Sequence, residues 1–195
     1  MDKRLDKLAR YLSILFNSSV LAVPIFLGMA WAETRVFLPA LGWTAMALLF
    51  ADGVPLTYLA VGLRRGWVSG FDMPRRQERG PFIAANLTGN GVGYLLLRAM
   101  GAPDALAALL LVYVGMGATM LTISLFWKIS LHAGGVGGFA AVLTWRFGPV
   151  WALAFLAVLL VGWARVHRQR HTWTQVIAGG LVGAAVTTLV LALAL

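Results

Sequence analysis

The sequence contains no cysteine among its 195 residues. This absence excludes a disulfide framework, and it also excludes a metal site built from thiolate ligands. Acidic residues are scarce as well, since 7 Asp and Glu stand against 16 Lys and Arg, and the formal net charge is +9. So few carboxylates argue against a site that holds two metal ions, and we expect neither a metal nor another cofactor.

Apolar residues, by contrast, make up 60% of the chain. A soluble domain of this size could not cover so much apolar surface. Several stretches approach or exceed the roughly 18 to 20 apolar residues that are needed to cross a bilayer. Because no linker or low-complexity tract interrupts the chain, we predict one integral membrane domain over residues 1–195.

The predicted fold is an all-α, polytopic bundle of six to seven transmembrane helices. Helices are required because lipid offers the backbone no hydrogen-bond partner outside its own segment. Turn residues between the apolar runs separate the candidate helices. These are residues 11–31, 36–63, 81–99, 104–127, 131–147, 149–164 and 173–195.

The basic residues fall almost entirely on one face if seven spans alternate in direction. Of the 16 Lys and Arg residues, only Arg35, Arg98 and Arg146 fall on the other face. The positive-inside rule then places the basic face in the cytoplasm. A miscounted span, for which 36–63 is the first suspect, would reverse this orientation. Topology and attraction to anionic head groups account for the net charge, so no nucleic-acid partner is expected.

Three polar segments on the basic face, 70–82, 127–138 and 164–175, carry the residues that are able to do chemistry. Arginine forks suit phosphate oxygens, and histidine can attack phosphorus or transfer a proton near neutral pH. The inventory favours chemistry on a phosphate group without a metal. The alternative is a set of interfacial anchors that share no site. The residues are Arg75, Arg76, Arg79, Lys128, Ser130, His132, Arg165, Arg168, Arg170 and His171.

The spacing within these segments resembles the type 2 phosphatidic acid phosphatase (PAP2) family, which also includes the vanadium haloperoxidases. The family's motifs read K-x6-R-P, P-S-G-H and S-R-x5-H-x3-D. The resemblance covers roughly residues 70–195, and its specificity lies in the third motif. The corresponding residues are Asp72, Arg79, Gly80 and Pro81 for the first motif, Ile129, Ser130, Leu131 and His132 for the second, and Ala164, Arg165, His171 and Gln175 for the third.

This resemblance implies a membrane lipid phosphatase that works through a phosphohistidine, on lipid phosphates or prenyl diphosphates. It assigns His171 as the nucleophile and His132 as the acid that protonates the leaving oxygen and later activates water. It assigns the binding of the phosphate oxygens to Arg79, Ser130 and Arg165. Lys128, two residues before Ser130, is expected to add charge. With the orientation above, this site would face the cytosol.

Two departures from the family pattern bear directly on the chemistry. Asp72 stands where the family has lysine, and Arg75 or Arg76 are the candidates to replace its charge. Gln175 stands where the family has aspartate; it can accept a hydrogen bond from the His171 ring but cannot stabilise an imidazolium by charge. Two other interpretations therefore stay open: a catalytically weak or inactive relative that binds anionic lipid or a partner, and an anion transporter.

A mid-span carboxylate, Asp52, raises a separate question because such groups are costly in a membrane. Gly53 and Pro55 favour a helix break that Asp52 would cap, and the alternative is a role in substrate or proton handling. Asn86 and Asn90, one helical turn apart, are expected to bond across helices rather than touch a ligand.

Overall fold

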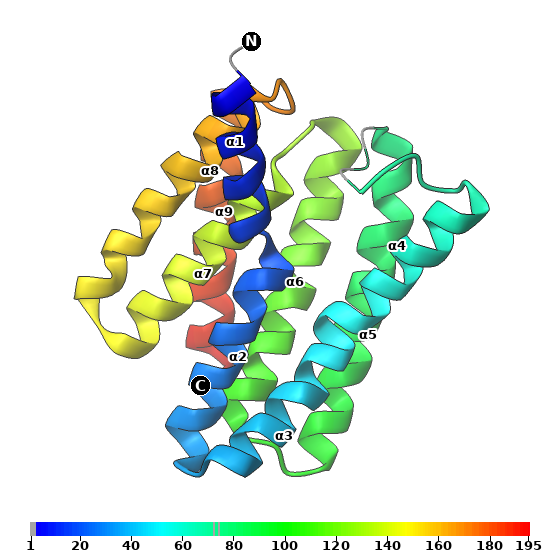
Figure 1. The fold of residues 1–195 in the computed structure, drawn as a ribbon. Helices are drawn as coiled ribbons and strands as arrows, with labels where there is room; N and C mark the ends of the chain where they lie inside the picture. Colours follow the sequence, from blue (N-terminus) through cyan, green and yellow to red (C-terminus); the bar gives the residue numbers. More distant parts are fainter. Residues whose placement is uncertain (1–2, 72, 74) are drawn as a thin grey trace. The chain divides into compact units, whose positions relative to one another are not determined.

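The computed structural model describes residues 3–71, 73 and 75–195, and within them the chain is all-α, as predicted. No strand forms in this described part of the chain. The helices (Figure 1) are α1 (Lys3–Leu15), α2 (Ser18–Thr34), α3 (Phe37–Leu48), η1 (Leu49–Gly53), α4 (Val54–Arg65), η2 (Arg76–Glu78), α5 (Arg79–Ala99), α6 (Asp104–Phe126), α7 (Leu131–Phe147), η3 (Pro149–Phe155), α8 (Leu156–His167) and α9 (Trp173–Ala194).

Five helical segments among the described residues are long and apolar enough to cross a membrane. This supports an integral membrane protein, whereas the count of six to seven spans is not confirmed. Two predicted spans fall short: α7 has only 17 residues, and α5 carries polar residues along its length. The five segments are Lys3–Thr34, Phe37–Arg65, Asp104–Phe126, Pro149–His167 and Trp173–Ala194.

The helix predicted over 11–31 is divided into two. α1 ends at Leu15, and Asn17 starts α2 by accepting a hydrogen bond on its Oδ1 from the Ser19 amide at 3.0 Å. An asparagine at a helix start satisfies an amide that has no partner inside the helix, which is why the chain can turn here. The apolar pattern continues through this turn, so periodicity alone does not reveal it.

The chain divides into two compact units. Unit 1 comprises Met1–Ile25 and Trp127–Leu189, and unit 2 comprises Phe26–Phe126 and Val190–Leu195. The second and third candidate motifs belong to unit 1, and the first belongs to unit 2. The single domain over 1–195 stays a prediction, since a division by contacts does not say whether either unit folds alone.

In unit 1, α7 and α9 meet along glycines. A Cβ added to Gly137 would lie 2.2 Å from the carbonyl oxygen of Gly180, and one added to Gly183 would lie 2.1 Å from that of Gly134. No side chain fits at such distances, so the two backbones are in direct contact, as small residues allow in membrane helices. We call this contact the glycine seam; both helices are visible in Figure 1.

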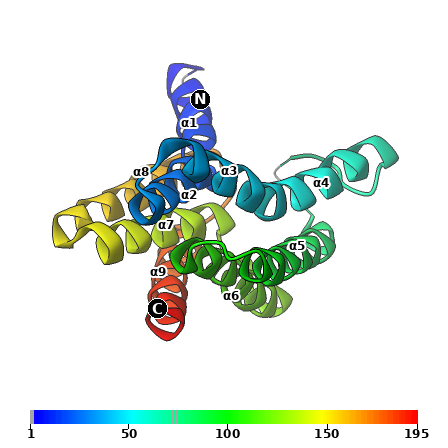
Figure 2. The ribbon, with the colours of Figure 1, turned by 90° about the horizontal axis from the view of Figure 1, so that it is seen from below.

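In unit 2, α5 and α6 form a hairpin whose helices run side by side (Figures 1 and 2). The turn between them uses Gly101 at φ +75°, a conformation that L side chains adopt rarely. Leu97 of α5 and Leu106, Leu109 and Leu110 of α6 are fully buried. These leucines contribute to the buried apolar interior of unit 2.

The expected helix break at Asp52 is wrong. α3 continues into α4 through η1, a π-helical turn, and the start of α4 has no side-chain cap. Pro55 has no N–H to donate to the Ala51 carbonyl four residues earlier. The Asn86 side chain donates to that carbonyl instead, Nδ2 to O at 3.4 Å. Asn86 therefore bonds across helices as predicted, whereas Asn90 donates to Asn86 O within α5 at 2.9 Å.

Candidate functional site

The third candidate motif is built on the end of α8. Gln169 has a positive φ of +54°, its amide donates to Val166 O at 2.8 Å, and the Arg170 amide donates to Arg165 O at 2.9 Å. These two bonds are those of a Schellman motif, which ends a helix and reverses the chain. The His171 amide also donates to Arg165 O, at 3.3 Å. The five-residue spacing between Arg165 and His171 thus spans one compact turn.

The start of α9 is a capping box. The Gln175 amide donates to Thr172 Oγ1 at 3.4 Å, and the Thr172 amide donates to Gln175 Oε1 at 3.3 Å. Two amides that lack partners inside the helix are satisfied reciprocally in this way. Thr172 is a residue that the motif analysis missed, although the sequence shows the signal as Thr172-x-x-Gln175.

The same glutamine oxygen lies 3.0 Å from Nδ1 of His171. Because Oε1 already accepts the Thr172 amide, the carboxamide presents its oxygen to the ring, and Nδ1 must carry the proton that it donates. In the neutral imidazole, the lone pair of His171 is then on Nε2. This is the protonation state that a nucleophilic imidazole needs, and the prediction that Gln175 accepts from the His171 ring agrees with this geometry.

The second candidate motif is tied to the third by the backbone. Ser130 is completely buried and precedes α7, where its Oγ accepts from the Ala133 amide at 3.3 Å. Its own amide donates to Gln175 O in α9 at 3.2 Å. A Cβ on Gly179 would lie 2.5 Å from Ser130 O, so this approach needs glycine. The seam between α7 and α9 therefore brings the starts of both helices together.

Positive charge gathers where these helices start. The N-terminal ends of α7 and α9 each carry the positive end of a helix dipole. Arg165, in the last turn of α8, is buried with 3% exposure, His132 is half-buried in the first turn of α7, and Lys128 is exposed just before it. Two helix N-termini beside an arginine suit an anion.

The loop before His171 is also held by α1. Arg168 Nε lies 3.9 Å from Asp6 Oδ1, with side-chain exposures of 22% and 46%. α1 packs on α8 through a face on which Ala9 and Ser13 are buried. The opening of the chain thus contributes a carboxylate to the basic end of unit 1, a contact that motif spacing does not indicate.

The first candidate motif forms its own polar cluster in unit 2. Arg79 is buried with 7% exposure, and its Nε donates to Met73 O at 3.1 Å. Glu78 is buried too and accepts from Ser69 Oγ at 3.0 Å, and Arg75 Nε lies 3.9 Å from its other oxygen. Arg75 thus pairs with Glu78. Asp72 and the side chain of Arg76 lie outside the described residues, so the proposed replacement of the family lysine stays a prediction.

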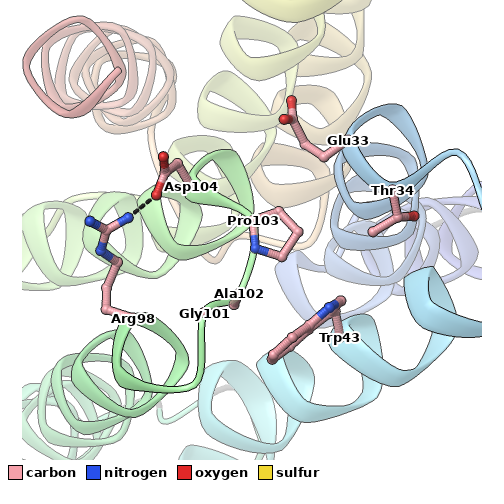
Figure 3. A pocket seen from close by; sticks show the side chains of 8 residues that line it. All are labelled: Glu33, Thr34, Trp43, Arg98, Gly101, Ala102, Pro103 and Asp104. Atoms are coloured by element: carbon pink, nitrogen blue, oxygen red, sulfur yellow. Dashed lines mark hydrogen bonds and ion pairs between the residues drawn. The ribbon is translucent and has the colours of Figure 1, made fainter.

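The motifs assign no role to two further polar features. His167 stacks on Trp163 with ring centroids 5.2 Å apart, which gives the third histidine a packing role. In unit 2, a pocket of about 660 Å³ (Figure 3) contains the ion pair of Arg98 with Asp104. It is lined by Glu33, Thr34, Trp43, Arg98, Gly101, Ala102, Pro103 and Asp104, none of them a predicted site residue.

Within the described part of the chain, no three His, Asp or Glu side chains group closely enough to hold a metal ion. Comparison of the chain with family models, with curated proteins and with solved structures found no match. The resemblance to the PAP2 family therefore depends on the motif spacing alone.

Proposed function

We propose that the chain is a membrane-embedded, metal-independent lipid phosphatase that forms a phosphohistidine at His171. The observation that carries this proposal is the joined start of α7 and α9. There the Ser130 amide donates to Gln175 O, and Oε1 of Gln175 lies 3.0 Å from Nδ1 of His171, which leaves Nε2 as the ring atom that would attack phosphorus. Helix N-termini that attract an anion, next to an imidazole whose Nε2 can attack phosphorus, suit the transfer of a phosphoryl group.

The proposed reaction has two steps. Nε2 of His171 attacks phosphorus in line with the leaving oxygen, the P–O bond to the lipid breaks, and His132 gives that oxygen a proton. Water then attacks the phosphorus of the phosphohistidine while His132 takes the water's proton, the P–N bond to Nε2 breaks, and inorganic phosphate leaves. Ser130, Lys128 and Arg165 stabilise the charge on the non-bridging oxygens, together with the helix amides. The resemblance adds Arg79 to this group.

The substrate proposed is a phosphate monoester or diphosphate of a lipid, such as a phosphatidic acid or a prenyl diphosphate. The apolar helices support a substrate that reaches the site from the bilayer. We further propose six to seven spans and a site that faces the cytosol, since the basic arm of α1 belongs to the same unit as motifs two and three.

A panel of lipid phosphates in detergent tests the activity. We expect phosphate release by the unaltered protein, inhibition by vanadate, and a loss of at least about a thousandfold in His171→Ala. His167→Ala is the matched control, because it removes a histidine four residues away that stacks on Trp163 instead of contacting Gln175. Equal release by the unaltered protein and His171→Ala would refute the phosphohistidine.

Sidedness is tested with an impermeant maleimide on intact cells, since the chain has no native thiol. Ser69→Cys places a thiol on an exposed residue of the first motif's loop. We expect no labelling of this variant from outside. Leu38→Cys, at an exposed residue in the first turn of α3, should label if the turn between α2 and α3 is external. Strong labelling of Ser69→Cys would contradict a cytosolic site.

A second function, a catalytically weak or inactive protein that binds anionic lipid, is favoured by one observation. Ser130 and Gln175 each perform a helix-capping task that needs no catalysis. A protein of this kind would bind vesicles with anionic lipid and release no phosphate from any member of the panel. The variants Gln175→Glu and Gln175→Asp separate the two functions, because a carboxylate at position 175 should raise turnover only in a phosphatase.

A further inference from the structure

Unit 2 contains a cluster of buried and half-buried polar side chains that the proposed phosphatase does not use. Its members are Asp52 in η1, Asn86 and Asn90 on α5, and Tyr113 on α6. All of them lie within helices whose other residues are mostly apolar. Polar side chains placed so far from helix ends are costly in a membrane and are functional by default.

Asp52 lies in a distorted part of its helix. η1 is a π-helical turn, a feature that is rare and frequent at functional sites because it widens the helix and releases backbone carbonyls. Asp52 is half-buried and interacts electrostatically with Tyr113. The carboxylate does not cap α4, whose start has no side-chain cap. Capping is therefore not the reason for an acid at this position.

Asn90 supplies an independent observation. The residue has 0% exposure, and its Nδ2 donates to Asn86 O at 2.9 Å. Its Oδ1 is buried and has no hydrogen-bond partner. Buried acceptors without a partner are rare in folded proteins, and an ion is one of the few ways to satisfy them.

Helix geometry places these oxygens together. Asn86, Asn90 and Gly93 share the face of α5 toward η1, where a Cβ on Gly93 would lie 2.5 Å from Phe50 Cβ. On α6, a Cβ on Gly117 would lie 3.5 Å from Asn86 Oδ1. Because α5 and α6 are antiparallel, Tyr113, one turn before Gly117, is level with Asn90, one turn after Asn86.

We propose that this cluster is a binding site for a hard monovalent cation, with sodium as the ion to test. Carboxylate, carboxamide and phenol oxygens are hard ligands, and one carboxylate balances a single positive charge. The described residues offer no group of three acidic or imidazole ligands that would suit a divalent ion. The cation satisfies Asn90 Oδ1 and neutralises Asp52, and it stabilises the π-helical turn.

The experiment compares melting temperatures of the purified full-length protein in sodium chloride and in choline chloride at equal ionic strength. We expect sodium to raise the melting temperature of the unaltered protein, and Asp52→Asn to abolish this shift. Asp104→Asn, which makes the same change at an exposed carboxylate of unit 2, should keep the shift. Asn90→Ala should raise the sodium concentration for half of the effect by about tenfold.

Three outcomes would overturn the proposal. The first is a melting temperature that does not distinguish sodium from choline. The second is an equal sodium shift in the unaltered protein and Asp52→Asn. The third is a melting temperature that depends on pH through Asp52 and is indifferent to sodium, which would assign the cluster to a proton. If Asp52→Asn does not fold, the sodium titration of Asn90→Ala tests the proposal instead. An unchanged sodium concentration for half of the effect would contradict it.

Discussion

Two helix contacts in this protein use glycine in different ways. At the glycine seam of unit 1, a Cβ on Gly137 would meet the backbone oxygen of Gly180 at 2.2 Å. In unit 2, a Cβ on Gly93 would meet the side chain of Phe50 at 2.5 Å, where α5 packs on the π-helical turn. The first contact joins two backbones, and the second makes room for a ring. Only the first determines where two helices start relative to each other.

The polar groups near the two contacts differ accordingly. Beside the seam, Ser130, Thr172 and Gln175 satisfy the free amides of helix starts, and these bonds position His171. Beside the π-helical turn, Asn86 satisfies a carbonyl that a proline leaves without its usual partner, and Asn90 Oδ1 has none. A helix end can thus satisfy its polar groups locally, whereas a distortion in mid-helix depends on side chains from other helices.

The largest effect is expected from Gly137→Ala. Neither backbone at the seam can yield easily, so we expect a loss of about 3 kcal/mol in unfolding free energy and of most phosphate release. Gly135→Ala is the control in the same helix, because its Cβ would lie 3.0 Å from Ser18 Cβ, a contact that a shift of a few tenths of an ångström relieves. Unfolding in detergent measures both variants. Equal losses would show that the seam is not rigid.

Asn86→Leu should cost about 2 kcal/mol, because it leaves the Ala51 carbonyl without its donor. Pro55→Ala restores an N–H four residues after Ala51, so the double variant should lose less than the single Asn86 variant. A double-mutant cycle of unfolding free energies measures this coupling. Additive effects of the two substitutions would mean that Asn86 does not compensate for the proline.

Gln175→Glu should raise turnover by about tenfold, since a carboxylate stabilises the imidazolium of His171 that forms on phosphoryl transfer. Glutamate has the length of glutamine, so it keeps both bonds of the capping box, whereas Gln175→Asp restores the family residue with a shorter reach. Initial rates on the best substrate of the panel measure the change. No activity in either variant would favour the lipid-binding function over the phosphatase.

The smallest effect is expected from Thr172→Ala, which removes one half of the capping box at an exposed helix start. The loss of unfolding free energy should be about 1 kcal/mol. Thr174→Ala serves as the control, because the Thr174 hydroxyl bonds to the Thr172 hydroxyl, Oγ1 to Oγ1 at 2.8 Å, and is no part of the capping box. An equal loss in both variants would argue that the hydroxyl pair, rather than the cap, stabilises the turn.

Part of the site could be predicted from sequence because its spacing is local. Arg165, His171 and Gln175 lie within eleven residues, and one helix end, one turn and one helix start connect them. The Schellman turn itself was not predictable, since its left-handed position is Gln169 instead of glycine. The bond from Ser130 to Gln175 joins segments 45 residues apart, and no periodicity in either segment indicates it.

The sequence by itself determined that the chain is all-α and apolar enough for a membrane, that it has no thiolate chemistry, and that its cations cluster near helix ends. These properties follow from composition and from local periodicity. Only the tertiary structure decided that Gly137 faces a backbone, that Asn86 serves Ala51, and that Gln175 both caps α9 and orients His171. The physical reason is that such contacts depend on which helix faces pack together, and each side chain acquires its partner only after that packing is complete.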